Sequence, residues 1–258
     1  MKLYLHYLSL HMKTIMQYKG SFWMTSFGQL LNALSALAVV WILMGRFGQV
    51  EGYSAGEVFL CFGTVNMAFA LAELFFRGFD AFAGTVRTGE FDRILVRPRN
   101  EIFQVLVSKL ELTRWVRILE GAVVLLVGIG ICGIRWSGVR VLGLVFLLLG
   151  GTAYFAGLFL IYAAFCFFTL EGLEFMNILT EGGKEFGAYP LAIYGKGMLA
   201  AFTFVLPMAC FQYYPFLYLT GRSADPWLLL TPACCFLFLL PCYVFWRFGV
   251  RRYKSSGS

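Results

Sequence analysis

Long stretches without a charged residue set the first limit on what this chain can fold into. No charge occurs between Lys19 and Arg46, and none occurs from Val141 to Leu170. A helix needs about 20 mostly apolar residues to cross a bilayer. The whole chain is 60% hydrophobic and only 14% charged, whereas soluble domains average about 25% charged residues. The sequence therefore predicts a membrane protein.

The apolar stretches predict an all-α membrane domain with six transmembrane helices. The predicted spans cover residues 22–45, 57–76, 114–134, 141–169, 197–214 and 226–246. They belong to one domain, residues 1–254, and residues 255–258 form a short polar tail. Before the first span, polar residues recur at helical spacing in residues 2–19, which indicates an amphipathic helix lying on the membrane surface. A cytoplasmic coupling helix is expected between the second and third spans.

The basic residues predict the orientation of these spans. Seventeen of the 21 Lys and Arg residues fall on one of the two alternating sides, and four fall on the other. Cytoplasmic loops carry the excess of Lys and Arg, so both termini are expected in the cytoplasm. The net charge of +7 is thus a topology signal, and it does not indicate nucleic-acid binding.

Cysteine and histidine show no metal-binding pattern. The seven cysteines lie in or beside apolar runs without any CxxC spacing, and both histidines, His6 and His11, fall in the surface helix. We expect mostly small buried cysteines, no metal site and no catalytic residues.

The stretch between the second and third spans, residues 77–101, is too long and too patterned for a simple turn. Gly89 permits a break in the helix, and Pro98 disfavours helix at Arg97 and favours a new start. A short charged element between two breaks suits docking on a soluble partner. A solvated positive loop is the alternative.

Polar and aromatic residues within the spans are candidates for lining a translocation path, because polar side chains are costly in lipid. Glu73 can instead pair with Arg77 one turn later, and the polar groups of the first span can bond between helices. The candidates are Gln29, Asn32, Asn66, Glu73, Phe211 and Gln212.

Two features of the second half of the chain carry weaker expectations. Pro207 interrupts the predicted fifth span and is expected to kink it, either statically or as a hinge. The connection before that span contains Glu171, Glu174, Glu181 and Glu185. We expect it to be a solvated cytoplasmic segment, which Gly182–Gly183 breaks into two short helices.

Two motifs resemble ABC-2 family permeases. The first is Phe76-Arg77-Gly78-Phe79-Asp80 followed by the run from Arg87 to Pro98, which is similar to the pattern R-G…G-x-x-D-x-x-L-x-R-P. The second is the run Tyr189–Tyr194 followed by Pro207 and Tyr213-Tyr214-Pro215. The order of the motifs and the six spans extend the resemblance over nearly the whole chain.

The resemblance implies the membrane subunit of an exporter in a bacterial cell membrane. Two such subunits, identical or paralogous, would bind two cytosolic ABC ATPases and export an amphiphilic substrate. The residues that the resemblance assigns to ATPase coupling are Arg87, Gly89, Glu90, Phe91, Asp92, Arg93, Arg97 and Pro98.

The sequence carries no nucleotide site of its own. A P-loop needs G-x-x-x-x-G-K-[ST], and neither Gly183-Lys184 nor Gly195-Lys196 fits it. ATP and Mg²⁺ are therefore expected on a partner chain. The alternatives are a secondary transporter, which usually shows an internal repeat, and a membrane-embedded lipid-modifying enzyme, which would need several convergent reactive groups.

Overall fold

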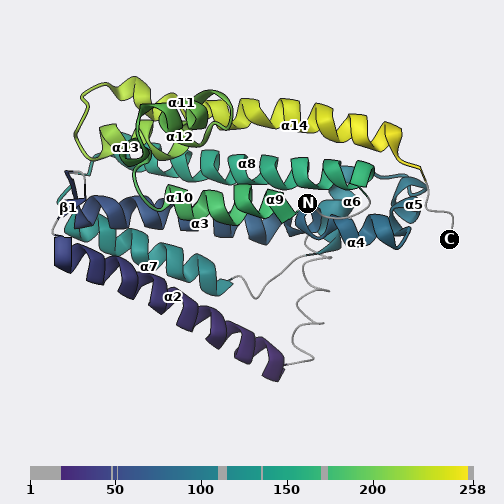
Figure 1. Cartoon of the computed structure of the whole chain (residues 1–258), viewed down its shortest axis with the longest axis horizontal. Helices are drawn as coiled ribbons and strands as arrows, with labels where there is room; N and C mark the ends of the chain where they lie inside the picture. Colours follow the sequence, from purple (N-terminus) through teal and green to yellow (C-terminus); the bar gives the residue numbers. More distant parts are fainter. Residues whose placement is uncertain are drawn as a thin grey trace.

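The computed structural model describes residues 19–47, 49–50, 52–109, 115–134, 136–169 and 174–254. Five long helices dominate it, and consecutive ones pack against each other in the order α2, α7, α3, α8, α14 (Figure 1). Their bounds are α2 Lys19–Phe47, α3 Ala55–Asp80, α7 Trp115–Ile131, α8 Gly138–Thr169 and α14 Ala233–Arg252. The expected surface helix and the polar tail 255–258 lie outside the described residues.

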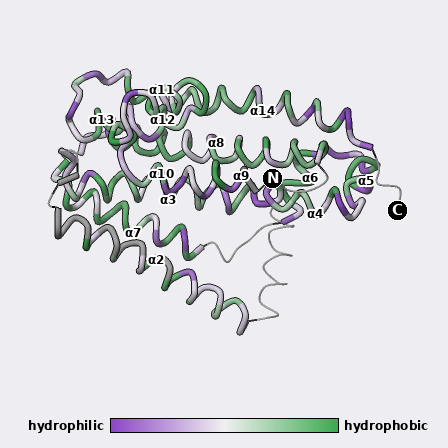
Figure 2. Tube along the Cα trace, viewed as in Figure 1, coloured by the Kyte–Doolittle hydropathy of each residue, from purple (hydrophilic) through white to green (hydrophobic). Residues whose placement is uncertain are grey.

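The helices are long and apolar enough for a membrane. Within the described residues, Ala55–Arg87, Gly138–Thr169 and Pro226–Arg252 each suffice for a crossing. Figure 2 shows hydrophobic colour along much of α8 and α14, with hydrophilic colour near α4 and α5 and at the last turns of α14. An apolar surface along such helices is stable only in lipid, so the chain is a membrane protein.

A small hairpin marks one end of the bundle, which we call the hairpin end. Strands β1 (Gln49–Val50) and β2 (Tyr53–Ser54) pair antiparallel between α2 and α3. Ser54 and Glu57 then form a capping box, in which each side chain bonds the backbone N–H of the other. This fixes the start of α3.

Helices α3 and α7 approach each other through glycines. A Cβ at Gly63 would lie 2.6 Å from the Leu125 nitrogen, and one at Gly128 would lie 2.5 Å from the Leu60 nitrogen. Small residues let helix backbones come this close in membranes, where packing rather than water drives association.

The opposite end of the bundle carries the segment after α3. It consists of three short helices, α4 (Phe82–Arg87), α5 (Glu90–Leu95) and α6 (Glu101–Ser108). We call residues 82–108 the connector, and this end of the bundle the connector end (Figure 1). The predicted coupling segment 77–101 therefore contains short helices separated by breaks.

The segment after α8 differs from our expectation. Residues 174–187 form α9 (Glu174–Asn177), the π-helix η2 (Ile178–Gly182) and α10 (Gly183–Gly187), with no break between them. Gly182 and Gly183 have helical φ values of −61° and −58°, so they do not interrupt it. Helix α10 packs on α3, and η2 packs on α8. The expected break at Gly182–Gly183 is therefore wrong. Glu181 and Lys184 form ion pairs, whereas the Glu185 side chain is 68% exposed; Glu171 lies outside the described residues.

The region expected as a fifth span at 197–214 is also divided. It contains α11 (Lys196–Phe204), α12 (Met208–Gln212) and α13 (Tyr214–Leu219), preceded by the short 3-10 helix η3 (Leu191–Tyr194). The helical segments Lys196–Phe204 and Met208–Leu219 meet at an angle of 98°. The bend falls at Pro207, which has no N–H to continue the helix. The 3-10 helix η4 (Pro226–Leu230) then leads into α14.

Candidate functional site

The connector is built by local signals at each of its breaks. Gly89 has φ 69°, a left-handed conformation that suits glycine and separates α4 from α5. Asn100 caps α6 by accepting from the backbone N–H groups of Ile102 (2.9 Å) and Phe103 (3.3 Å). Gln104 Nε2 donates to the carbonyl oxygens of Ile94 (2.9 Å) and Arg99 (3.0 Å). These bonds fix the turn between α5 and α6.

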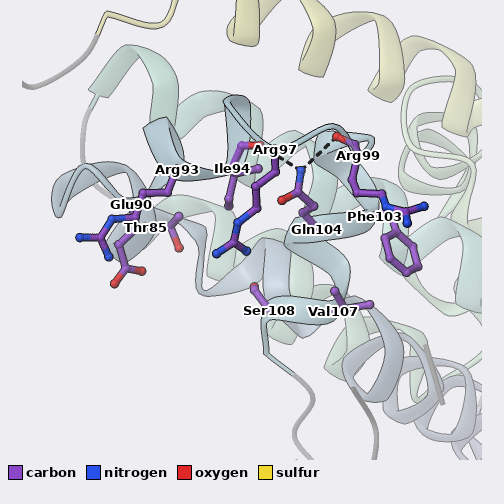
Figure 3. Close-up of a pocket in the computed structure, with 10 residues that line it drawn as sticks. All are labelled: Thr85, Glu90, Arg93, Ile94, Arg97, Arg99, Phe103, Gln104, Val107 and Ser108. Carbon is purple, nitrogen blue, oxygen red and sulfur yellow. Dashed lines mark hydrogen bonds between the residues drawn. The ribbon is translucent and has the colours of Figure 1, made fainter. Parts of the chain in front are cut away.

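A pocket of about 440 Å³ opens beside this turn (Figure 3). Figure 3 shows the Arg97 and Gln104 side chains next to each other in it. The charged lining residues are one carboxylate and three guanidinium groups, so the pocket favours an acidic partner group. They are Glu90, Arg93, Arg97 and Arg99.

The tip of the connector exposes both charged and apolar side chains. Among the residues predicted for coupling, Arg87, Glu90, Arg93, Arg97 and Pro98 are exposed. Between them, Leu95 is 45% exposed and Val96 is 83% exposed. We did not single out these two residues from sequence, because apolar residues beside arginines also fit a buried helix face.

Phe91 has a different position from its neighbours in the predicted set. It is fully buried, with ring centroids 5.3 Å from Phe82, 5.1 Å from Phe167 and 5.1 Å from Tyr253. Trp246 of α14 lies 6.3 Å from the same ring. Phe91 therefore attaches α5 to α8 and α14, and it has no surface to offer a partner. We call these five rings the aromatic junction.

Asp92 lies beside the same junction. Burial, followed by the nearby Asp92 carboxylate, raises the pKa of Tyr253. The end of the chain after α14 is thus in contact with α5. A second link is the ion pair between Arg247 of α14 and Glu101 of α6, at 3.0 Å.

The close contact between Gly78 and α6 explains why the first motif has a glycine at this position. A Cβ at this position would collide with the carbonyl oxygen of Val105 in α6. Helix α6 therefore lies directly on α3, and only glycine permits the contact. The connector is held against the bundle on this side as well.

Glu73 lies inside a network of charges where the bundle meets the connector end. Its side chain is fully buried, 3.3 Å from Arg77 and 2.6 Å from Arg117 of α7. Arg117 is also 3.8 Å from Glu181. Lys184 lies 3.1 Å from Glu181 and 3.1 Å from Glu185. The local pairing predicted between Glu73 and Arg77 is present, and it is one part of a larger network.

The structure separates the other candidates for a translocation path. Phe211 is fully buried against Tyr154 and Phe155, at centroid distances of 5.5 and 6.0 Å. Asn66 donates to the Phe62 carbonyl of its own helix at 3.0 Å. The Gln29 Oε1 atom is buried without a hydrogen-bond partner among the described residues. The Asn32 side chain lies outside the described part.

Gln212 joins the second motif to α3. Its buried amide donates to the carbonyl oxygens of Gly187 (3.2 Å) and Tyr189 (2.8 Å) and lies 2.6 Å from Cys61 Sγ. The Cys61 thiol also donates to Gly187, at 3.4 Å. This arrangement satisfies backbone carbonyls at the end of α10, and it holds that end against the first half of α3.

The described residues contain no group of three or more His, Cys, Asp or Glu side chains placed to hold a metal ion. Five cysteines are buried, Cys132 is half-buried and Cys234 is exposed, and all seven are unpaired.

The described part of the chain is thus an apolar helical bundle with a basic connector attached at one end. The family model described as "ABC-2 family transporter protein" matches residues 30–257. The chain therefore belongs to the ABC-2 transporter family and is a permease subunit of an ABC transporter. Comparison with curated proteins and with solved structures gives no match.

Proposed function

We propose that this permease exports an amphiphilic substrate, driven by separate ABC ATPase chains that dock on the connector. The observation that carries the proposal is the contrast between the two faces of α5. Leu95 and the arginines beside it are exposed, whereas Phe91 is buried in the aromatic junction. An ATPase bound to the outer face would move α8 and α14 through Phe91.

The surface of the connector would fit a groove on the partner ATPase that has acidic walls and an apolar floor. Val96 and Leu95 supply apolar area, and the guanidinium groups of Arg93 and Arg97 suit carboxylates on the partner. ATP and Mg²⁺ would be bound by the ATPase. Two ATPase chains and a second permease, identical or paralogous, complete the proposed assembly.

The contacts support six crossings, with residues 174–187 as the fifth. Helix α10 ends at Gly187, which bonds Cys61 in the first half of α3. After α13, Arg222 bonds Glu57 and Gly52 at the hairpin end. Both ends of the segment between them therefore lie toward the same end of the bundle. We accordingly assign α11–α13 as a re-entrant hairpin rather than a span.

The proposed topology keeps the positive charges on one side. In this topology, 15 of the 21 Lys and Arg residues fall on the connector side, within residues 2–19, 77–117 and 247–254. Five fall on the other side, and Lys184 falls within the proposed fifth crossing. By the positive-inside rule the connector and both termini are cytoplasmic. A bacterial cell membrane is the proposed location, with export from the cytoplasm or inner leaflet.

The docking surface is tested by reversing charge on the connector. R93E/R97E should abolish co-purification of the partner ATPase and its stimulation by the permease, because two exposed cations become anions. R251E is the matched control: Arg251 is exposed on α14 at the same end, outside the connector, and should leave both readouts intact. Unchanged stimulation in R93E/R97E would show that the ATPase docks elsewhere.

The orientation is tested by accessibility labelling. A cysteine at the exposed Leu95 should react with a membrane-impermeant maleimide only after the cells are opened, measured against the native cysteines of the parent chain. Labelling of L95C in intact cells would place the connector outside and contradict the proposal.

A further inference from the structure

A stack of phenylalanine rings lies on the surface of the bundle where α8 and α14 reach the connector end (Figure 1). Phe168 of α8 stacks with Phe245 and Phe248 of α14, at centroid distances of 6.0 and 5.8 Å and interplanar angles of 19° and 27°. Phe168 is 45% exposed and Phe248 is 47% exposed. We call these three rings the ring stack; unlike the buried rings of the aromatic junction, it can contact a ligand.

Arg252 adds a positive charge to the ring stack. Its guanidinium carbon lies 5.2 Å from the centroid of the Phe248 ring, within the range of a cation–π interaction. Arg252 comes one turn after Phe248 on α14, so the two side chains share a face of the helix. The ring therefore positions an exposed cation at the edge of an apolar surface.

This cation has no carboxylate partner in the part of the chain that the structure describes. The basic residues that form ion pairs there are Arg77, Arg117, Lys184, Arg222 and Arg247. Arg252 is not among them, and Asp92, a carboxylate at this end of the bundle, contacts Tyr253 instead. A cation–π contact leaves the N–H donors of a guanidinium able to bond an anion, and their planar fork matches a phosphate group.

The position of Arg252 along α14 corresponds to the level of lipid headgroups. Arg247 is the first charged residue after Pro226, and the 21 residues between them span about 32 Å at 1.5 Å per residue. The hydrocarbon core of a bilayer is about 30 Å thick, and its headgroup layers lie outside it. Arg252 lies about 8 Å beyond Arg247 along the helix. It therefore lies in a headgroup layer, with the ring stack at the boundary of the hydrocarbon.

We propose that Arg252 and the ring stack bind an anionic phospholipid. The lipid phosphate would bond the guanidinium, and an acyl chain would pack along the exposed Phe168 and Phe248 rings. A zwitterionic headgroup would bring a cation of its own next to Arg251 and Lys254, which are both exposed, so a headgroup with net negative charge is favoured. The proposal goes beyond the proposed export function, because it needs no ATPase and holds for either orientation of the chain in the membrane.

A lipid bound here would stabilise the end of α14. Trp246 and Tyr253 lie on either side of Phe248 in the sequence, and both contact Phe167 of α8 in the aromatic junction, at centroid distances of 5.1 and 5.7 Å. A ligand that holds Phe248 against Phe168 therefore strengthens the same pairing of α8 and α14. Since a ligand that binds only the folded chain raises its stability, binding is measurable as a rise in unfolding temperature.

The test follows thermal unfolding of the full chain in a neutral detergent while lipid is added. Dioleoylphosphatidylglycerol, which is anionic, should raise the unfolding temperature in a saturable manner. Dioleoylphosphatidylcholine, which has the same acyl chains and no net charge, should not. Inorganic phosphate should neither reproduce the effect nor displace the lipid, because it has no acyl chain for the rings. Equal stabilisation by the two lipids, or displacement by phosphate, would overturn the proposal.

Three variants locate the site. R252Q should weaken phosphatidylglycerol binding about fivefold, the effect of losing one basic residue at a membrane surface. F248L keeps an apolar side chain but removes the ring beneath the guanidinium, so it should also weaken binding. R251Q is the matched control: it removes the same charge from the neighbouring exposed residue, for which no ring contact is found in the described part, and should bind the lipid as the parent chain does.

Two results from the variants would contradict the proposal. Equal weakening in R251Q and R252Q would show a diffuse attraction of the lipid to the basic end of the chain and no defined site. If R252Q or F248L dissociated a permease dimer, measured by light scattering, without changing the response to phosphatidylglycerol, this face would bind a second copy of the chain instead. No ATPase is present in these measurements, so neither result affects the proposed docking on the connector.

Discussion

The carboxylate of Glu73 lies 2.6 Å from the guanidinium of Arg117, although no part of the Glu73 side chain is exposed. The two residues belong to α3 and α7, and the pair joins these helices where α7 begins. A buried carboxylate costs a large desolvation energy unless cations surround it. The charges at this level therefore hold three segments, α3, α7 and the 174–187 stretch, in register.

Removing Arg117 should destabilise the chain more than removing the whole pair. R117Q removes the guanidinium closest to the buried Glu73 carboxylate, and we expect a loss of roughly 3 kcal/mol, the lower end for a broken buried pair. The double variant E73Q/R117Q should recover part of this loss. Thermal unfolding of the purified chain in detergent measures both. Additive effects of the two substitutions would contradict a direct interaction.

Gly78→Ala should detach the connector from the bundle. The added Cβ would collide with the Val105 carbonyl oxygen, so α6 must shift away from α3. We expect a lower unfolding temperature and weaker stimulation of the ATPase. Gly84→Ala is the matched control, because a Cβ at Gly84 meets nothing within 4 Å and alanine favours helix. Parent-like behaviour of G78A would show that the contact is not required.

Alanine substitutions at Phe91 and Leu95 should distinguish an effect on folding stability from an effect on ATPase coupling. F91A empties a fully buried site in the aromatic junction, and such truncations cost about 3–5 kcal/mol. L95A removes a side chain that is 45% exposed; it should leave the unfolding temperature nearly unchanged and lower ATPase stimulation. Unfolding curves and ATPase assays on both variants measure the two effects. Equal loss of stability in F91A and L95A would contradict the assignment of the two faces of α5.

Arg222→Lys should weaken the hairpin end despite keeping the charge. Arg222 Nε and Nη2 donate to the two Glu57 oxygens at 2.6 and 2.9 Å, and the guanidinium lies 4.2 Å from the Tyr53 ring. The Glu57 partner raises the pKa of Arg222 further. Lysine lacks the planar fork for this geometry. We expect a fall in unfolding temperature of a similar size in R222K and R222Q. Full retention of stability in R222K would show that charge alone suffices.

The uncharged stretches identified α2, α3, α8 and α14 because lipid imposes a simple rule on composition. The same rule did not identify the helical segment 174–187. Its Glu and Lys residues look solvated when read alone, since Glu181 is 64 positions from Arg117, its partner on α7. Only the folded chain brings the two within 3.8 Å.

In the connector, too, contacts between residues far apart in the sequence could not be predicted. Gly89 and Pro98 marked the positions of its breaks, because backbone restrictions are local, but α6 starts at Glu101 and not at Pro98 as expected. The inward orientation of Phe91 depends on Trp246 and Phe167, which lie far along the chain. Sequence alone therefore located the connector without distinguishing the exposed face of α5 from the buried face that contains Phe91.

The aromatic junction has a mechanical consequence. Rings from α4, α5, α8, α14 and the chain end interlock with edge-to-face geometry at several pairs, so sliding one element past another would force the others apart. A displacement of α5 would thus be transmitted to α8 and α14 together, through Phe167 and Trp246. An ATPase docked on α5, as proposed, would therefore move α8 and α14 together as one unit.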